Sequence, residues 1–203
     1  MGEYIMKEID ARGLACPAPV LQTKAAVEQE DANAVKVVVD NEAAQQNVER
    51  FLVSHGFETS LEKDGNDFFI IGTCSTAPQP QPAGVTQTDA EPKKIMVMCA
   101  TDRIGFGDDD LGLKLMINFV RTLKEMGPDL WRLVLVNNGV KLSIEFSEVL
   151  QDLKELEECG VKILVCGTCL DHFNLLEKKQ VGETTNMLDI VTAMQLADKV
   201  INI

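Results

Sequence analysis

Basic residues and long apolar runs are both scarce in this sequence. The 203 residues contain 19 Lys and Arg against 32 Asp and Glu, which gives a formal net charge of −13. A chain this acidic repels phosphate backbones and anionic lipid headgroups, so neither nucleic acid nor a membrane surface is expected as a partner. No apolar run approaches the length that a membrane span needs.

Cysteines are also few, and their number helps to predict the cellular compartment of the protein. Six cysteines in 203 residues are too sparse for a disulfide-stabilised scaffold. Residues 1–8 have neither the basic region nor the apolar core of a signal peptide. Both features predict a cytoplasmic protein whose cysteines are free thiols.

A segment in which prolines alternate with glutamines divides the sequence. It covers residues 76–92. Such a segment neither forms regular backbone hydrogen bonds nor buries apolar area. We therefore predict a first domain over residues 1–75, a Pro/Gln-rich linker over 76–92 and a second domain over 93–203.

The first domain has the pattern βαβαββ. The predicted elements are a strand over 4–9, a helix after Cys16 with Pro17 in its first turn, a strand over 35–39, a helix capped by Asp40 or Asn41 and ending at Gly56, and a hairpin of 57–62 and 68–72. The first helix is expected to bury a stripe of Val20, Leu21, Ala25 and Val27. This order predicts a two-layer sandwich with both helices on one face of the sheet.

The second domain alternates strands with helices. Continuous apolar runs over 95–100, 133–136 and 161–166 are typical of parallel strands buried on both faces. A helix near 188–197 and a short strand over 200–203 follow. The pattern predicts a doubly wound, flavodoxin-like α/β domain, in which ligands bind at the carboxyl ends of the strands. The loops expected there are 101–110, 137–140 and 166–173, so the turn at 137–139 is expected to line the same crevice as the last loop.

Cys16 is the first candidate reactive residue. A sulfur just before the first helix would face unpaired backbone N–H groups and the positive end of the helix dipole, and both favour the thiolate. Pro17 and Pro19 would fix the entry of the chain, and Gly13 would permit a turn that brings Arg12 near. The same pattern also allows a small, buried and inert cysteine.

Residues 10–19 resemble the signature of the TusA/SirA-like sulfur carriers. They read Asp10-Ala11-Arg12-Gly13-Leu14-Ala15-Cys16-Pro17-Ala18-Pro19 and include the Cys-Pro-x-Pro core. The resemblance covers residues 5–72 with the same βαβαββ order. It implies that Cys16 carries a persulfide that a cysteine or selenocysteine desulfurase donates and an acceptor protein receives. It implies no cofactor, and it makes Asp10, Arg12, Gly13, Pro17 and Pro19 supports of the Cys16 loop.

Cys166-Gly167-Thr168-Cys169 is the second candidate site. The spacing suits a redox pair in which one thiol attacks and the other resolves. Zinc usually needs four ligands and only His172 is near, so a structural metal site is not expected. Two inert thiols at a strand end are the remaining alternative.

Three segments of residues 93–203 resemble the DsrE-like sulfur-relay domains. These segments are 100–112, 136–142 and 166–171. The resemblance implies a persulfide-accepting cysteine in such a loop and association into homo-oligomers. The tandem order of the two domains resembles that of the YedF selenium-metabolism proteins, which implies that the cargo includes selenium. Residue chemistry alone does not separate sulfur from selenium.

Other signals are weaker. Gly107 and Gly112 have the spacing of a phosphate-binding loop, but Leu113 stands where the lysine would be, so no nucleotide site is expected. Asp108–Asp110 are expected to cap the following helix. Three cysteines are expected to have no role in the chemistry: Cys74 as an exposed thiol, Cys99 as a buried one and Cys159 as a structural residue.

The sequence thus supports two hypotheses. In the first, Cys16 accepts sulfur or selenium and Cys166 or Cys169 takes it on. In the second, the protein is a non-catalytic module that docks a partner and senses redox state through the cysteine pair.

Overall fold

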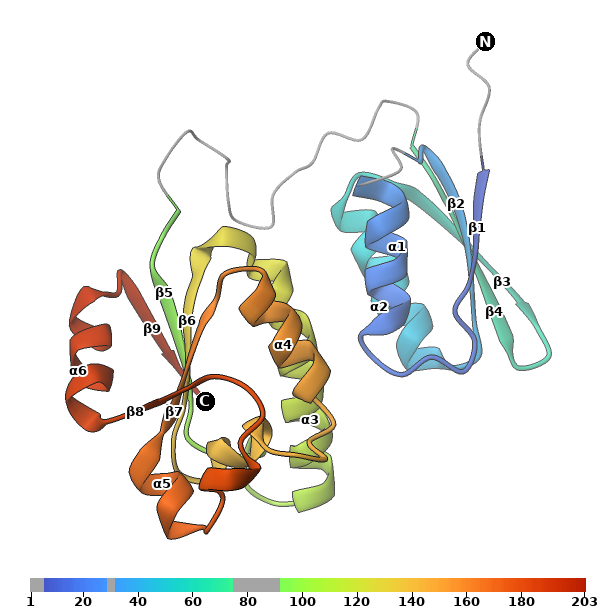
Figure 1. The fold of residues 1–203 in the computed structure, drawn as a ribbon. Coiled ribbons are helices and arrows are strands. Elements are labelled where there is room, and N and C mark those ends of the chain that lie inside the picture. The colour runs from blue at the N-terminus through green and yellow to red at the C-terminus, as the bar shows by residue number, and fades with distance from the viewer. Residues whose placement is uncertain (1–5, 29–31, 75–91) are drawn as a thin grey trace. The chain divides into compact units, whose positions relative to one another are not determined.

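The computed structural model describes residues 6–28, 32–74 and 92–203 (Figure 1). The chain divides into two compact units, Met1–Thr88 and Asp89–Ile203. Residues 76–91 of the predicted linker lie outside the described residues, so the linker and the domain bounds at 75 and 93 stay predictions. No helix in the described ranges combines the length and apolar character that a membrane crossing needs.

The N-terminal unit has the predicted order βαβαββ. Its elements are β1 (Met6–Asp10), α1 (Ala18–Glu28), β2 (Ala34–Val39), α2 (Glu42–Ser54), β3 (Glu58–Asp64) and β4 (Asp67–Thr73). The sheet order is β1-β2-β4-β3, with β1 parallel to β2 and the other neighbours antiparallel. Figure 1 shows α1 and α2 side by side on one face of this sheet, as the two-layer sandwich requires.

The first helix differs from the prediction in the residues it buries. Its buried residues are Pro19, Thr23, Ala26 and Val27, of which the predicted stripe contained only Val27. Thr23 is tolerated inside because its hydroxyl donates to the Pro19 carbonyl at 2.8 Å. A buried polar group costs little once it is hydrogen-bonded, so the helix turns this face toward the sheet.

The C-terminal unit is the predicted doubly wound α/β fold. Its strands and α-helices are β5 (Ile95–Cys99), α3 (Asp109–Thr122), β6 (Leu130–Leu135), α4 (Leu150–Glu158), β7 (Lys162–Cys166), α5 (Gly167–His172), β8 (Glu183–Thr185), α6 (Met187–Leu196) and β9 (Lys199–Asn202). Short 3₁₀ helices cover Leu123–Asp129, Asn137–Ser143 and Leu176–Lys178. Figure 1 shows α3 and α4 on one face of the sheet and α6 on the other.

The five strands of this unit are all parallel, in the order β8-β7-β6-β5-β9. The chain runs from β5 outward to β8 and then returns to β9 on the other side of β5. The order therefore reverses at β5, and the carboxyl ends of β5, β6 and β7 bring their following loops to one edge of the sheet.

Candidate functional site

Cys16 lies on an exposed loop between β1 and α1. Gly13 gives the loop its turn with a φ of +70°, a left-handed conformation that favours glycine. The Gly13 N–H donates to Asp40 Oδ2 at 2.7 Å, and this bond lowers the pKa of the Asp40 carboxyl. Asp40 follows β2, so a strand end holds the loop in place.

Arg12 connects two carboxylates. Its guanidinium contacts Asp10 Oδ2 at 2.6 Å and Asp67 Oδ2 at 3.0 Å. The hydrogen bonds from the Arg12 side chain and backbone lower the pKa of Asp10 to about 2. Because two carboxylates surround the guanidinium, Arg12 fixes the base of the loop and adds little net positive charge near Cys16.

The start of α1 corrects two predictions. Pro17 accepts the first helical bond, from Leu21 N at 3.1 Å, so it caps the helix and does not lie in its first turn. The N–H groups expected to face Cys16 are already used. Ala18 N donates to Ala15 O at 3.0 Å, Val20 N donates to Pro17 O at 3.1 Å, and Pro19 has no N–H. Of the two predicted sources of positive potential for the sulfur, the helix dipole remains.

A small hollow lies beside Cys16, between the amino ends of α1 and α2. Its lining is mainly apolar, with the amide side chains of Asn41 and Asn47 on the α2 side. Asn41 also caps α2 by accepting the Ala44 N–H at 2.9 Å, which decides between the two predicted caps. The Asn41 amide also donates to Asp40 Oδ1 at 3.1 Å, so the hollow offers a group attached to Cys16 a mainly apolar wall.

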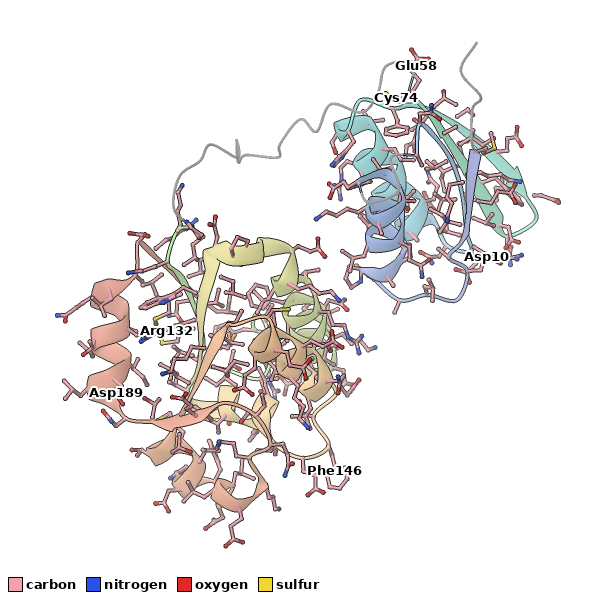
Figure 2. The ribbon with its side chains drawn as sticks, turned by 45° about the horizontal axis from the view of Figure 1, so that its top comes forward. Asp10, Glu58, Cys74, Arg132, Phe146 and Asp189 are labelled. Atoms are coloured by element: carbon pink, nitrogen blue, oxygen red, sulfur yellow. The ribbon has the colours of Figure 1, made fainter. Side chains whose placement is uncertain are left out.

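The other thiol described in this unit, Cys74, is remote from Cys16. Figure 2 shows Asp10, at the start of the Cys16 loop, and Cys74 at opposite ends of the sheet. Cys74 is buried, not exposed as predicted, and its thiol donates to the Gly56 carbonyl at 3.6 Å. Cys16 therefore has no thiol neighbour within the described part of its unit.

In the C-terminal unit, Cys166 and Cys169 are in contact. Cys166 ends β7 and is 4% exposed, whereas Cys169 in α5 is half-buried. The Cys169 thiol donates to Cys166 Sγ, with the two sulfurs 2.9 Å apart. The Asn137 N–H, from the loop after β6, donates to Cys169 Sγ at 3.1 Å. The loops after β6 and β7 therefore meet at this thiol, as predicted.

The surroundings of Cys169 favour its neutral thiol, because the pKa of this group is raised overall. Burial raises the pKa of Cys169, the Cys166 thiol raises it further, and the Asn137 N–H lowers it. In the same unit, burial alone raises the pKa of Cys99 to about 12. Cys99 is fully buried, as predicted, and ends β5.

The remaining candidates have structural contacts. Asp108 caps α3 by accepting the Leu111 N–H at 2.8 Å. His172 is exposed and packs edge-on against Phe173, with ring centroids 5.0 Å apart. Cys159 is exposed at the end of α4. Within residues 6–28, 32–74 and 92–203, no group of three His, Cys, Asp or Glu side chains is arranged to hold a metal ion.

Sequence reasoning missed two groups that hold the loop of Cys16. Asp40 was considered only as a helix cap, and Asp67 was not considered. Their contacts with Gly13 and Arg12 span 27 and 55 residues, and no local pattern indicates them.

The two halves of the chain match different protein families. Residues 7–72 match the model of the sulfurtransferase TusA family, and residues 107–203 match that of the DsrE/DsrF-like family. A candidate sulfur carrier protein of Methanocaldococcus jannaschii is 36% identical over 67 residues, which are 32% of this chain and 89% of that protein.

Two solved structures are also similar. The SirA-like protein from Desulfitobacterium hafniense has 31% sequence identity and a TM-score of 0.31, covering 34% of this chain and 95% of that one. The ychN protein from E. coli has 20% identity and a TM-score of 0.44, covering 55% of this chain and 99% of that one.

Proposed function

Because the chain belongs to the sulfurtransferase TusA family through its N-terminal unit, we propose that it carries sulfur as a persulfide on Cys16. The observation that supports this proposal is the exposed position of Cys16, on a fixed loop, beside a partly apolar hollow. A carrier thiol must be open to two successive protein partners, and this one is.

The chemistry is thiol exchange. The Cys16 thiolate attacks the outer sulfur of a persulfide on the donor, the Cys16–S–SH bond forms, and the donor's thiolate leaves. The positive end of the α1 helix dipole attracts the terminal anion of the persulfide. Asn47, which lines the same hollow, carries an amide N–H group that can donate to that anion.

We assign the donor to the cysteine or selenocysteine desulfurases. In this proposal selenium takes the place of the outer sulfur, because the tandem arrangement of the two domains resembles selenium-metabolism proteins and a perselenide undergoes the same exchange. An acceptor thiol, on another protein or at Cys166 and Cys169, then takes the cargo. A tether between the units would raise the effective concentration of one site at the other. Free thiols of this kind persist in a reducing compartment such as the cytoplasm.

Loading of Cys16 is the first test. With Cys166 and Cys169 both replaced by serine, the reduced protein should gain one sulfur on Cys16 from a desulfurase and cysteine. Further replacement Cys16→Ser should lower protein-bound sulfur by on the order of 100-fold, because it removes the nucleophile. The measurement is mass spectrometry of the alkylated protein, repeated with selenocysteine as the substrate.

Cys159→Ser is the matched control, because Cys159 is also exposed and should not affect loading. An unmodified Cys16 beside an active donor would remove the carrier proposal for that donor. If, in addition, the wild-type protein formed the Cys166–Cys169 disulfide reversibly, the redox-sensing module would be the better description.

We also propose that the C-terminal unit associates with copies of itself through α6. This helix exposes the apolar side chains of Met187, Leu188, Val191 and Leu196 and lies on the side of the sheet opposite α3 and α4. The DsrE-like resemblance supports a second copy as the occupant. Burial of such side chains contributes about 1.5–3 kcal/mol each.

The mass in solution tests this association. The wild type should sediment as a multiple of 22.3 kDa, and Leu188→Glu should weaken association at least about tenfold by burying a charge. Leu61→Glu, at an exposed leucine of the N-terminal unit, should leave the mass unchanged. A monomeric wild type at micromolar concentration would contradict the proposal.

A further inference from the structure

Resting on the proposed function, we propose that the Cys166–Cys169 pair ends the relay by reduction. In this step the pair releases the carried sulfur as hydrosulfide, or the carried selenium as hydroselenide, and is itself oxidised to a disulfide. The C-terminal unit is then an outlet for the cargo and not a second carrier.

Accessibility assigns the two roles. Cys169 is half-buried and open to a donor, whereas Cys166 is 4% exposed. A donor persulfide therefore reaches Cys169 first. The Asn137 N–H lies 3.1 Å from Cys169 Sγ and can stabilise negative charge as that thiol loses its proton. Cys166 is left as the resolving thiol, reached from inside the protein.

Proximity decides what happens next. The two sulfurs are 2.9 Å apart, so a persulfide formed on Cys169 has a second thiol in contact with its inner sulfur. An intramolecular thiol at this distance acts at a high effective concentration. Cys16 is arranged differently, because the other thiol described in its unit, Cys74, lies at the opposite end of the sheet. An isolated thiol suits carriage and a paired thiol suits release.

The two steps balance without another reactant. First, the Cys169 thiolate attacks the outer sulfur of R–S–SH, which forms Cys169–S–SH and expels R–S⁻. Second, the Cys166 thiolate attacks Cys169 Sγ, which forms the Cys166–Cys169 disulfide and expels HS⁻. The protons of Cys166 and Cys169 pass to the solvent. Two thiols lose two electrons, and the outer sulfur changes from oxidation state zero to minus two.

A second turnover needs an external dithiol that reduces the disulfide. The single-turnover reaction uses only the reduced protein and the persulfide, so the test is restricted to it.

The experiment uses the full chain with Cys16→Ser, so that its result does not depend on loading at Cys16. The protein is reduced, freed of reductant and mixed without oxygen with one equivalent of glutathione persulfide. Sulfide is trapped with a bimane reagent, and the cysteines are mapped by mass spectrometry after alkylation. The same protein with Cys166→Ser and Cys169→Ser together gives the background.

The expected result is a burst of about one sulfide per protein, with loss of two alkylatable thiols as the disulfide forms. Cys166→Ser alone should slow the burst by on the order of 100-fold and trap one added sulfur on Cys169. Cys169→Ser alone should abolish both the burst and the adduct. Cys166→Ala is the second resolving-thiol variant, and circular dichroism checks that each variant folds.

A stable persulfide on Cys169 in the parent would overturn the proposal and make Cys169 a carrier. An undiminished burst in the folded Cys166 variants would also overturn it. Failure of Cys16 loading leaves this experiment unaffected, so the two proposals fail separately.

Discussion

Replacement of Gly139 by alanine should destabilise the C-terminal unit by about 3 kcal/mol or more, because the added methyl has no room. A Cβ at this position would lie 2.1 Å from the Cys99 carbonyl oxygen and 3.0 Å from its carbon. Both atoms are backbone, so the clash is relieved only by moving a strand end or the loop that crosses it. The Cys99 carbonyl also accepts the Val136 N–H at 3.1 Å, and such a movement breaks this bond.

The measurement is urea unfolding of the reduced protein followed by Trp131 fluorescence. The chain has one tryptophan, in β6, so the signal reports the C-terminal unit. Gly160→Ala, at the end of α4, is the control: its φ is +94° and the space around it is open, so it should cost only about 1 kcal/mol of left-handed strain. Equal urea midpoints for Gly139→Ala and the control variant would show that the contact between Gly139 and Cys99 is loose.

The same substitution has a functional consequence. Gly139 and Asn137 share the loop after β6, and the Asn137 N–H donates to Cys169 Sγ. A loop displaced from Cys99 takes this donor away from Cys169. Variant protein that remains folded should therefore accept sulfur on Cys169 more slowly, with Cys166 still in place. Sulfide release and unfolding, measured on one preparation, separate the two effects.

The fold was predictable wherever apolar pattern and length agreed. The β-branched run of β2 and the continuous apolar runs of β5, β6 and β7 predicted these strands because burial dictates their composition. β8 was missed because its sequence, Glu183–Thr185, is short and polar, and two of its three residues are exposed. Its place depends on pairing with β7 and on Gly182, whose Cβ position would lie 2.8 Å from Val165 Cγ2.

The candidate site was predictable in its residues but not in its contacts. The spacing of Cys166 and Cys169 indicated a pair, and the fold rule placed the 137–140 loop beside it. The hydrogen bonding of the backbone N–H groups at the amino end of α1 was not predictable, because a pattern of residues does not show which of these groups are already bonded. The pattern of residues also did not show that Arg12 pairs with Asp67, which is distant in the sequence.

Raising the pH should destabilise the C-terminal unit through Cys99. Burial raises the pKa of this thiol to about 12, whereas an unfolded cysteine ionises near pH 8.5–9. The folded-state pKa is the higher one, so the stabilisation is complete below pH 9 and is lost as the pH rises toward 12. The loss is about 1.4 kcal/mol per pH unit, or on the order of 4 kcal/mol over the whole interval.

Comparison of the wild type with Cys99→Ala isolates this contribution. Both proteins contain Cys169 and the lysines, so the titration of those groups cancels in the difference between the two free energies of unfolding. The free energy of unfolding of the wild type minus that of the variant should decline between pH 9 and 11, by about 3 kcal/mol. Cys159→Ala, at an exposed thiol, should run parallel to the wild type. Parallel curves for Cys99→Ala as well would mean that Cys99 ionises freely in the folded state.

A freely ionising Cys99 would be a third reactive sulfur at the edge of the sheet where the pair lies. It could then capture sulfur from Cys169 before Cys166 does, and the pair would no longer determine the product. A buried Cys99 that stays neutral does not capture sulfur from Cys169, because the thiolate and not the thiol is the nucleophile. Cys99→Ala should then leave the sulfide burst per folded protein unchanged, so one variant tests both the burial of Cys99 and the restriction of the chemistry to two thiols.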